Sequence, residues 1–344
     1  MLHITEKQNK VREYRVTLGG LLEEYTQSLL AMNRSPKTIS WYLEILGRYL
    51  AFLDSHKLLK PVGQLGRHEL QAYILHLQEV ERWPNNHSTG KLKGNLSPYS
   101  VQGHVRAIKA FWGWLKREEY TEKNSLAIFP LPKVPEKPVG ILSMDQIRKL
   151  LTHIDRYTPV GARSYVMLML LLDTGIRVSE LVSIRMEDLD LQHGCIRVLG
   201  KGQKVRSVPM SKLTKKEVTR YIRHTDAQIY RIDSPYLFAK SDGTPVSVNS
   251  VQQFLRRLAR KAGLKGIRCS PHVFRHTFAT QSVANGANVF VLKEIMGHSN
   301  LNTTMKYTHL QPHDLQIQHA KFSPVVTLAT TMASGRKYLN DANP

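Results

Sequence analysis

Six side chains in the second half of the sequence combine the residue types that handle phosphate and protons. Arginine binds phosphate oxygens through a planar, permanently charged fork. Lysine and histidine transfer protons, and a tyrosine hydroxyl is a nucleophile once its proton is removed. Any one of these residues alone is more commonly a surface, ion-pair or packing residue. The six are Arg177, Lys201, His272, Arg275, His298 and Tyr307.

In this order and with these neighbours, the six residues resemble the active-site set of the tyrosine recombinase (phage integrase) family. Arg177 stands in TGIRVSEL, and Lys201 stands in a GKG turn before a basic strand that ends in VPM. His272 and Arg275 share the segment SPHVFRHTFAT. The remaining two residues fall in GHSNLNTTMKYTH, so no member of the set is missing.

The resemblance is close over residues 140–310 and looser over residues 17–120. It implies a mainly α fold with a small antiparallel β-sheet, in which a helical core-binding (SAM-like) domain precedes the tyrosine-recombinase catalytic domain. About 16 residues precede the first expected helix. We therefore expect a simple, Xer-like recombinase without a separate arm-binding domain.

The resemblance also implies the function, a site-specific DNA recombinase that works through a 3′-phosphotyrosyl intermediate and a Holliday junction. Tyr307 is then the nucleophile and His272 its base, because a phenol with a pKa of about 10 is mostly protonated at neutral pH. Lys201 is the general acid for the departing 5′ oxygen. Glu180, in the same motif as Arg177, is expected to be a structural partner of a nearby basic group. The charge on the non-bridging oxygens is bound by Arg177, Arg275 and His298.

Two other functions use parts of the same residue set. A type IB topoisomerase nicks and closes one strand with nearly the same active site. A non-catalytic, sequence-specific DNA-binding protein needs only the basic surface. The presence of both Lys201 and Tyr307 favours an enzyme, and the short N-terminal bundle favours a recombinase over a topoisomerase.

We expect no cofactor and no metal. The covalent link to the cut strand conserves the bond energy, so rejoining needs neither ATP nor a metal, and the sequence has no GxxxxGK[ST] loop. His272 and His276 have the spacing of a zinc site, but Arg275 stands between them and would repel a dication. Cys195 and Cys269 fit neither a zinc motif nor a disulfide framework.

The chain is strongly basic, with 49 Lys and Arg against 27 Asp and Glu and a formal net charge of +22. Such an excess favours nucleic acid or an anionic membrane surface as a partner. The longest apolar run, residues 165–172, is too short to span a membrane, and the first residues show no signal-peptide pattern. We expect a cytoplasmic protein, either nucleoid-associated or encoded by a phage or mobile element. Its expected partner is double-stranded DNA with a specific recombination site. We expect a homotetramer on two duplexes, a monomer or dimer otherwise, and no membrane partner.

Candidate DNA contacts come from basic residues near helix starts and from two basic stretches. Residues 195–224 hold nine Lys and Arg with one acid, and residues 256–275 hold seven with no acid. Two such stretches in one domain favour a surface that follows a phosphate backbone. The candidates are Lys37, Arg106, Lys109, Lys204, Arg206, Arg256, Arg257 and Arg260.

Periodicity and turn signals place the secondary structure. Helices are predicted over 17–30, 36–53, 68–80, 98–119, 248–263, 271–286, 288–297 and 303–310. More than one helix is predicted within 143–172, and a new helix is predicted to start at Arg177. Strands are predicted over 195–199 and 205–210, and 236–240 is a candidate for a third strand.

Four prolines between residues 130 and 138 interrupt both helix and strand and mark a domain boundary. The apolar, β-branched segment 323–333 is of a kind that usually finds a partner surface. The resemblance implies docking on a neighbour, so we expect residues 310–333 to pack on the adjacent protomer. The alternative is that the tail folds back on its own catalytic domain. The predicted divisions are an extension 1–16, a core-binding domain 17–123, a Pro-rich linker 124–141, a catalytic domain 142–310 and a C-terminal tail 311–344.

Overall fold

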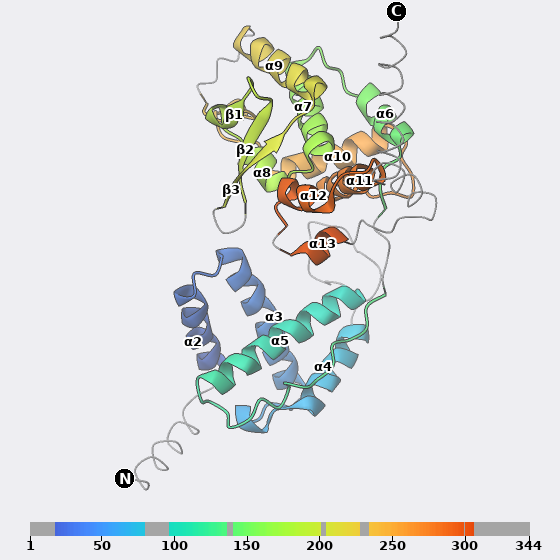
Figure 1. Cartoon of the computed structure of the whole chain (residues 1–344). Coiled ribbons are helices and arrows are strands. Elements are labelled where there is room, and N and C mark those ends of the chain that lie inside the picture. The colour runs from blue at the N-terminus through green and yellow to red at the C-terminus, as the bar shows by residue number, and fades with distance from the viewer. Residues whose placement is uncertain are drawn as a thin grey trace, which may run out of the picture. The chain divides into compact units, whose positions relative to one another are not determined.

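The computed structural model is mainly helical and carries one small antiparallel sheet (Figure 1). This confirms the predicted fold class. The chain divides into two compact units, Met1–Lys137 and Pro138–Pro344, and the division falls inside the predicted linker. The structure describes residues 18–79, 96–135, 140–200, 204–227, 234–298 and 300–305. The predicted extension, the C-terminal tail, Lys201 and Tyr307 lie outside these residues.

Four helices and one short 3₁₀ turn make up the described part of the first unit. Ser35 and Ser97 begin two of the helices in the same way, since each side chain accepts the backbone N–H three residues later and is followed by proline. The elements are α2 (Leu18–Ala31), α3 (Pro36–Ser55), η1 (Val62–Gln64), α4 (Arg67–Glu79) and α5 (Pro98–Arg117).

Helix α5 supplies the centre of this unit's core. Phe111, Trp112 and Trp114 are almost fully buried, and they pack with Tyr25 and Tyr49 from α2 and α3. Burial of large aromatic side chains is the main source of stability for such a small bundle. The opposite side of α5 remains polar, as the sequence predicts.

The second unit contains the remaining helices and the sheet. The described helices are α6 (Met144–Thr152), α7 (Pro159–Thr174), α8 (Val178–Ser183), η2 (Met186–Asp188), α9 (Lys212–Ala227), α10 (Val248–Lys261), α11 (Pro271–Ala284), α12 (Val289–Met296) and α13 (Leu301–Met305). None of the described helices is long and apolar enough to span a bilayer.

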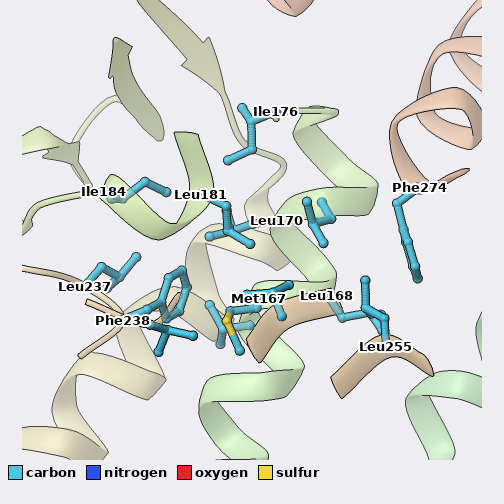
Figure 2. Close-up of a cluster of buried hydrophobic side chains, with 14 of the residues drawn as sticks. Met167, Leu168, Leu170, Ile176, Leu181, Ile184, Leu237, Phe238, Leu255 and Phe274 are labelled. Atoms are coloured by element: carbon cyan, nitrogen blue, oxygen red, sulfur yellow. The ribbon is translucent and has the colours of Figure 1, made fainter. Parts of the chain in front are cut away.

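Helix α7 is the central element of the second unit. It packs against both α9 and α11, so it is apolar around most of its circumference, as a surrounded helix must be. Figure 2 shows Met167, Leu168 and Leu170 of α7 among Phe238, Leu255 and Phe274. The helix ends at Gly175, whose φ of 59° places the chain in the left-handed region.

The sheet has the order β1 (Leu189–Asp190), β2 (Cys195–Leu199) and β3 (Val205–Pro209). Strands β2 and β3 form an antiparallel pair in which Leu199 lies opposite Val205. The Gly200 N–H donates to the Lys204 carbonyl at 2.8 Å, which closes the hairpin. Residues 201–203 therefore connect two well-registered strands.

Three elements differ from the sequence prediction. Residues 236–240 form only isolated bridges, Arg185 with Tyr236 and Ala239 with Pro245, so the prediction of a full strand there is wrong. Consecutive residues Leu237 and Phe238 are both buried, so the burial does not alternate as on a one-sided strand. Strand β1 and helix α9 were not predicted.

Candidate active site

A cleft of about 770 Å³ opens at the starts of helices α8 and α11. Its lining includes four of the six predicted catalytic residues, Arg177, His272, Arg275 and His298. Segments more than a hundred positions apart in the sequence thus meet at one place. The other two predicted residues lie outside the described part, although α13 ends at Met305, two positions before Tyr307.

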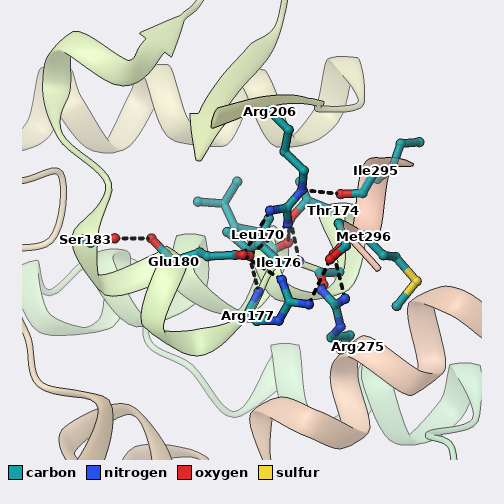
Figure 3. A network of polar contacts seen from close by, with 12 residues as sticks. Leu170, Thr174, Ile176, Arg177, Glu180, Ser183, Arg206, Arg275, Ile295 and Met296 are labelled. Carbon is teal, nitrogen blue, oxygen red and sulfur yellow. Dashed lines mark hydrogen bonds and ion pairs between the residues drawn. The ribbon is translucent and has the colours of Figure 1, made fainter. Parts of the chain in front are cut away.

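Arg177 stands at the N-cap of α8 and is held on two sides (Figure 3). Its Nη1 donates to Glu180 Oε1 at 2.9 Å, and its backbone N–H donates to Oε2 at 2.8 Å. Its Nη2 donates to the Gly297 carbonyl at 3.0 Å. With 37% of the side chain exposed, the fixed guanidinium still faces the cleft.

Arg275 is nearly buried, with 6% of the residue exposed. Its Nη1 donates to the Gly175 carbonyl at 2.6 Å, and its Nη2 donates to the Met296 carbonyl at 2.7 Å. The residue is therefore anchored through backbone carbonyls while it lines the cleft.

Glu180 connects two arginines through one buried carboxylate. Arg206 donates from Nη1 and Nη2 to the two carboxylate oxygens, each at 2.9 Å, and Arg177 shares the same group. Burial acts to raise the pKa of the Glu180 carboxyl, but the hydrogen bonds from Arg206 and Arg177 outweigh it and hold this pKa below its usual range. The prediction that Glu180 is a structural partner of a basic group is confirmed.

The sequence prediction for Arg206 needs correction. Its side chain is only 14% exposed, and besides Glu180 its Nε donates to the Ile295 carbonyl at 2.8 Å. Strand β3 alternates, so Arg206 points inward while Val205 and Ser207 point outward. Its guanidinium is engaged inside the protein by Glu180 and Ile295, so it is not available to bind DNA.

His272 has a neighbour whose role the sequence did not indicate. His276 Nε2 lies 2.8 Å from His272 Nε2, so one of the two imidazoles donates and the other accepts. Burial, followed by the charge of Arg275, lowers the pKa of His272. A neutral imidazole able to accept a proton is what a base for tyrosine requires. The i, i+4 spacing, considered in the sequence only as a zinc-site pattern, is what brings the two imidazoles together.

His298 follows the end of α12 and lies close to Thr304 of α13. Its Nδ1 is 2.9 Å from the Thr304 hydroxyl. Burial, and then the charges of Arg275 and Arg177, lower the pKa of His298 to about 4. At neutral pH it is therefore an uncharged hydrogen-bonding group beside two guanidinium groups.

This low pKa predicts a pH dependence of stability. A histidine whose pKa falls from 6.5 to about 4 on folding binds fewer protons in the folded state, so its contribution is complete above pH 6.5 and is lost towards pH 4. His298→Gln should remove this component. Between pH 5.0 and 7.5 the variant should gain less stability than the wild type. Allowing for solvent screening, we expect this difference to be about 1 kcal/mol, which corresponds to roughly 2–4 °C in Tm. Thermal melts of both proteins at the two pH values measure it, and parallel pH dependences would contradict it.

The other predicted DNA contacts are mostly exposed. In the first unit, Lys37 lies in the first turn of α3 and Arg106 is exposed on α5. Lys109 is half-buried and donates to the Phe129 carbonyl. In the second unit the exposed candidates are Lys204, Arg256, Arg257 and Arg260, of which Arg256 lines the cleft. Their contact with DNA stays a prediction.

The structure adds cleft residues that the sequence pattern did not indicate. Arg268, Gln252, Ser179 and Thr303 also line the cleft. Arg268 belongs to the basic stretch 256–275, and that membership could have identified it.

The other basic stretch, 195–224, divides between the sheet and α9. A second hollow of about 630 Å³ lies along α9 and is lined by Lys212, Lys215, Lys216, Thr219, Arg220 and Arg223. The residues that line this hollow include none of those that line the cleft.

Within the described ranges, no group of three His, Cys, Asp or Glu side chains is arranged to hold a metal ion. His272 of the cleft, which contacts His276, lies beside Arg275, whose charge disfavours a bound cation. The chemistry that the cleft offers comes from guanidinium and imidazole groups, which suit an anionic substrate.

Comparison with known proteins gives the same family at the level of sequence. Residues 141–314 match the phage integrase family. Tyrosine recombinase XerC of Oceanobacillus iheyensis is 30% identical over 304 residues, which cover 88% of this chain and 94% of that protein. Tyrosine recombinase XerD of Listeria innocua is 27% identical over 312 residues, covering 89% and 99%.

Solved structures of recombinases on DNA share the fold. The Tn1549 transposon integrase in complex with transposon right end DNA has a TM-score of 0.68 at 22% identity, covering 88% of this chain and 99% of that one. The XerH recombinase bound to its difH substrate has a TM-score of 0.64 at 20% identity, covering 88% and 83%.

Proposed function

Because the chain belongs to the phage integrase family and is a site-specific tyrosine recombinase, we propose that its cleft cuts and rejoins DNA through a phosphotyrosyl bond. The observation that carries this proposal is the convergence of Arg177 and Arg275 on one cleft, both held from behind by backbone carbonyls. Two fixed cationic forks bind the non-bridging oxygens of one phosphate and stabilise the charge that develops there. The names of the relatives favour a recombinase over a topoisomerase or a binding protein.

The remaining residues supply the proton transfers. The Tyr307 oxygen attacks the scissile phosphorus and its proton passes to His272. The bond from phosphorus to the 5′ oxygen breaks, and that oxygen takes a proton from Lys201. His298 donates a hydrogen bond to the phosphate alongside the arginines. Rejoining runs the same steps backwards, with the incoming 5′ hydroxyl as the nucleophile.

A nicked suicide substrate tests the proposal directly. Cleavage next to the nick releases a short fragment by diffusion, so the covalent complex accumulates and is seen as a slow band on a denaturing gel. A band that resists denaturant and disappears after protease digestion supports the phosphotyrosyl intermediate. Binding of the same DNA without such a band would leave a DNA-binding protein with no strand-cutting activity.

Lys201 should be dispensable when the leaving group needs no proton. Lys201→Ala should lower the cleavage of ordinary DNA by about 10²–10⁴-fold, the usual contribution of a general acid. A substrate with sulfur in place of the bridging 5′ oxygen should restore cleavage close to that of the wild type, because a thiolate leaves unprotonated. Single-turnover rates on both substrates measure this. Equal defects on the two substrates would exclude Lys201 as the acid.

For the assembled complex we propose four protomers on two duplexes. Two protomers then bind each duplex, and each protomer uses both of its units. The exposed basic residues Lys37, Arg106, Arg256, Arg257 and Arg260 are proposed to contact this DNA, together with Lys109 and Lys204. Residues 311–344 are proposed to dock on the adjacent protomer. The reaction is proposed to take place in the cytoplasm of a bacterial cell. Gel filtration of the protein in complex with paired recombination sites tests the proposed stoichiometry of four protomers on two duplexes.

A further inference from the structure

Three consecutive carbonyls at the end of α12 bind three different arginines. The Ile295 carbonyl accepts from Arg206 at 2.8 Å and the Met296 carbonyl accepts from Arg275 at 2.7 Å. The next carbonyl, that of Gly297, accepts from Arg177 at 3.0 Å. Figure 3 shows these side chains converging on the helix end from β3, α8 and α11.

The helix end explains why it gathers guanidinium groups. The last carbonyls of a helix have no partner within the helix and carry the negative end of its dipole. The two preceding carbonyls, those of Lys293 and Glu294, are satisfied by the N–H groups of His298 and Gly297 at 3.1 Å. The three that follow are then left to the arginines, so every carbonyl of the last turn has a donor.

Arg206, like Arg177, contacts both supports of the arginine pair, but unlike Arg177 and Arg275 it does not line the cleft. It binds Glu180, which fixes Arg177, and it binds the end of α12, which holds both Arg177 and Arg275. It also lies directly on Gly297, where a Cβ atom would meet its Nη1 at 2.8 Å. Gly297, with φ of 63°, allows both the helix end and this close approach.

We infer that Arg206 is a positioning residue for the strand-cutting reaction, one that sets the two phosphate-binding arginines through Glu180 and the α12 terminus. The inference rests on the proposed roles of Arg177 and Arg275. Arg206 itself touches no substrate. Because it stands on β3, two positions after Lys204 at the base of the hairpin, it also ties the strand that follows Lys201 to the phosphate site.

Geometry, rather than charge alone, gives Arg206 this role. Its three guanidinium nitrogens donate to three oxygens that lie in two directions. Two are the carboxylate oxygens of Glu180, and the third is the Ile295 carbonyl oxygen. A lysine is a point charge and cannot hold both directions at once. Arg206→Lys should therefore keep the net charge and still lose the arrangement.

The test uses the full chain with two variants at this support and one control. Arg206→Lys keeps the charge, and the double variant Glu180→Gln/Arg206→Met replaces the buried ion pair by neutral groups of similar size, a change that buried pairs often tolerate. Arg197→Met is the matched control. Arg197 is an exposed arginine on the adjacent strand β2, with the Glu187 carbonyl as its partner. Tm, affinity for the recombination site and single-turnover cleavage are measured for each.

We expect both support variants to melt close to the wild type, to bind the site within about twofold and to cleave it about 100-fold more slowly, the size of loss that a misplacement of about 1 Å can cause. The control should match the wild type. A second substrate, with a methylphosphonate at the scissile position, has one non-bridging oxygen replaced by a methyl group and is neutral. Because the methylphosphonate offers the arginines less charge to bind, the ratio of the wild-type cleavage rate to the variant cleavage rate should fall below about tenfold on this substrate.

The outcomes distinguish a positioning role of Arg206 from a purely structural or purely electrostatic one. The same rate ratio on phosphate and methylphosphonate, or cleavage by Arg206→Lys at the wild-type rate, overturns the inference. A loss that the drop in Tm or in affinity accounts for overturns it too, since Arg206 would then be structural. If the wild type itself forms no covalent complex, the proposed function fails instead, so the two failures are distinguishable.

Discussion

Tyr307→Phe will abolish the covalent protein–DNA complex while site binding stays within about twofold of the wild type. The change removes one hydroxyl, the proposed nucleophile, and leaves the aromatic ring. Without an oxygen to attack phosphorus, the remaining residues can bind the phosphate but cannot transfer it to the protein. The expected loss of adduct is therefore complete rather than partial, and a denaturing gel after incubation with a suicide substrate measures it.

A second tyrosine provides the control for this result. Tyr157 is 84% exposed in the second unit, and Tyr157→Phe should form the adduct at the wild-type rate. Adduct formation by Tyr307→Phe would assign the nucleophile to another residue. Adduct loss in both variants would indicate damage to the unit as a whole.

Local sequence signals mark the starts of helices in both units. Serine followed by proline marks the starts of α3 and α5, and the capping pair Ser143 and Gln146 marks the start of α6. The residues of the cleft stand in short motifs at helix starts and ends. The resemblance of these motifs to those of the tyrosine recombinase family predicted that Arg177, His272, Arg275 and His298 belong together.

The contacts that hold these residues could not be predicted from the sequence in the same way. Arg206 stands in a basic stretch among eight other Lys and Arg residues, and composition treats them all alike. It points inward because of the register of β2 and β3, and its partners Glu180 and Ile295 are 26 and 89 positions away. Which arginine is buried depends on the tertiary structure, not on charge density.

Helix α9 was missed for a related reason. Its basic residues dominate the local composition, and the narrow apolar face is formed by Thr214, Val218 and Tyr221, which are buried. Only two of these three have the apolar character that periodicity detects, so the helical repeat is weak in the sequence. The surface against α7 supplies the stability that the local pattern does not show.

Arg275→Lys will lower strand cleavage by about 10²–10³-fold, with little change in the net charge of the cleft. Removal of one preorganised donor to a developing oxyanion typically costs this much. Arg275 now bridges the Gly175 and Met296 carbonyls and lines the cleft with the same group. A lysine ammonium cannot span the two carbonyls and also present a fork to the phosphate. Single-turnover cleavage on a suicide substrate measures the loss.

The conservative change is the informative one at this position. Arg275→Ala would leave two carbonyls of a 6%-exposed site without their donor and would cost stability as well as activity. Arg268→Lys provides the comparison, since Arg268 is exposed on the same cleft and is not one of the three arginines that bind the end of α12. We expect it to lose less than about tenfold, through weaker binding alone. Equal losses in the two lysine variants would mean that the cleft needs only positive charge, and that the anchoring of Arg275 by Gly175 and Met296 contributes nothing to the reaction.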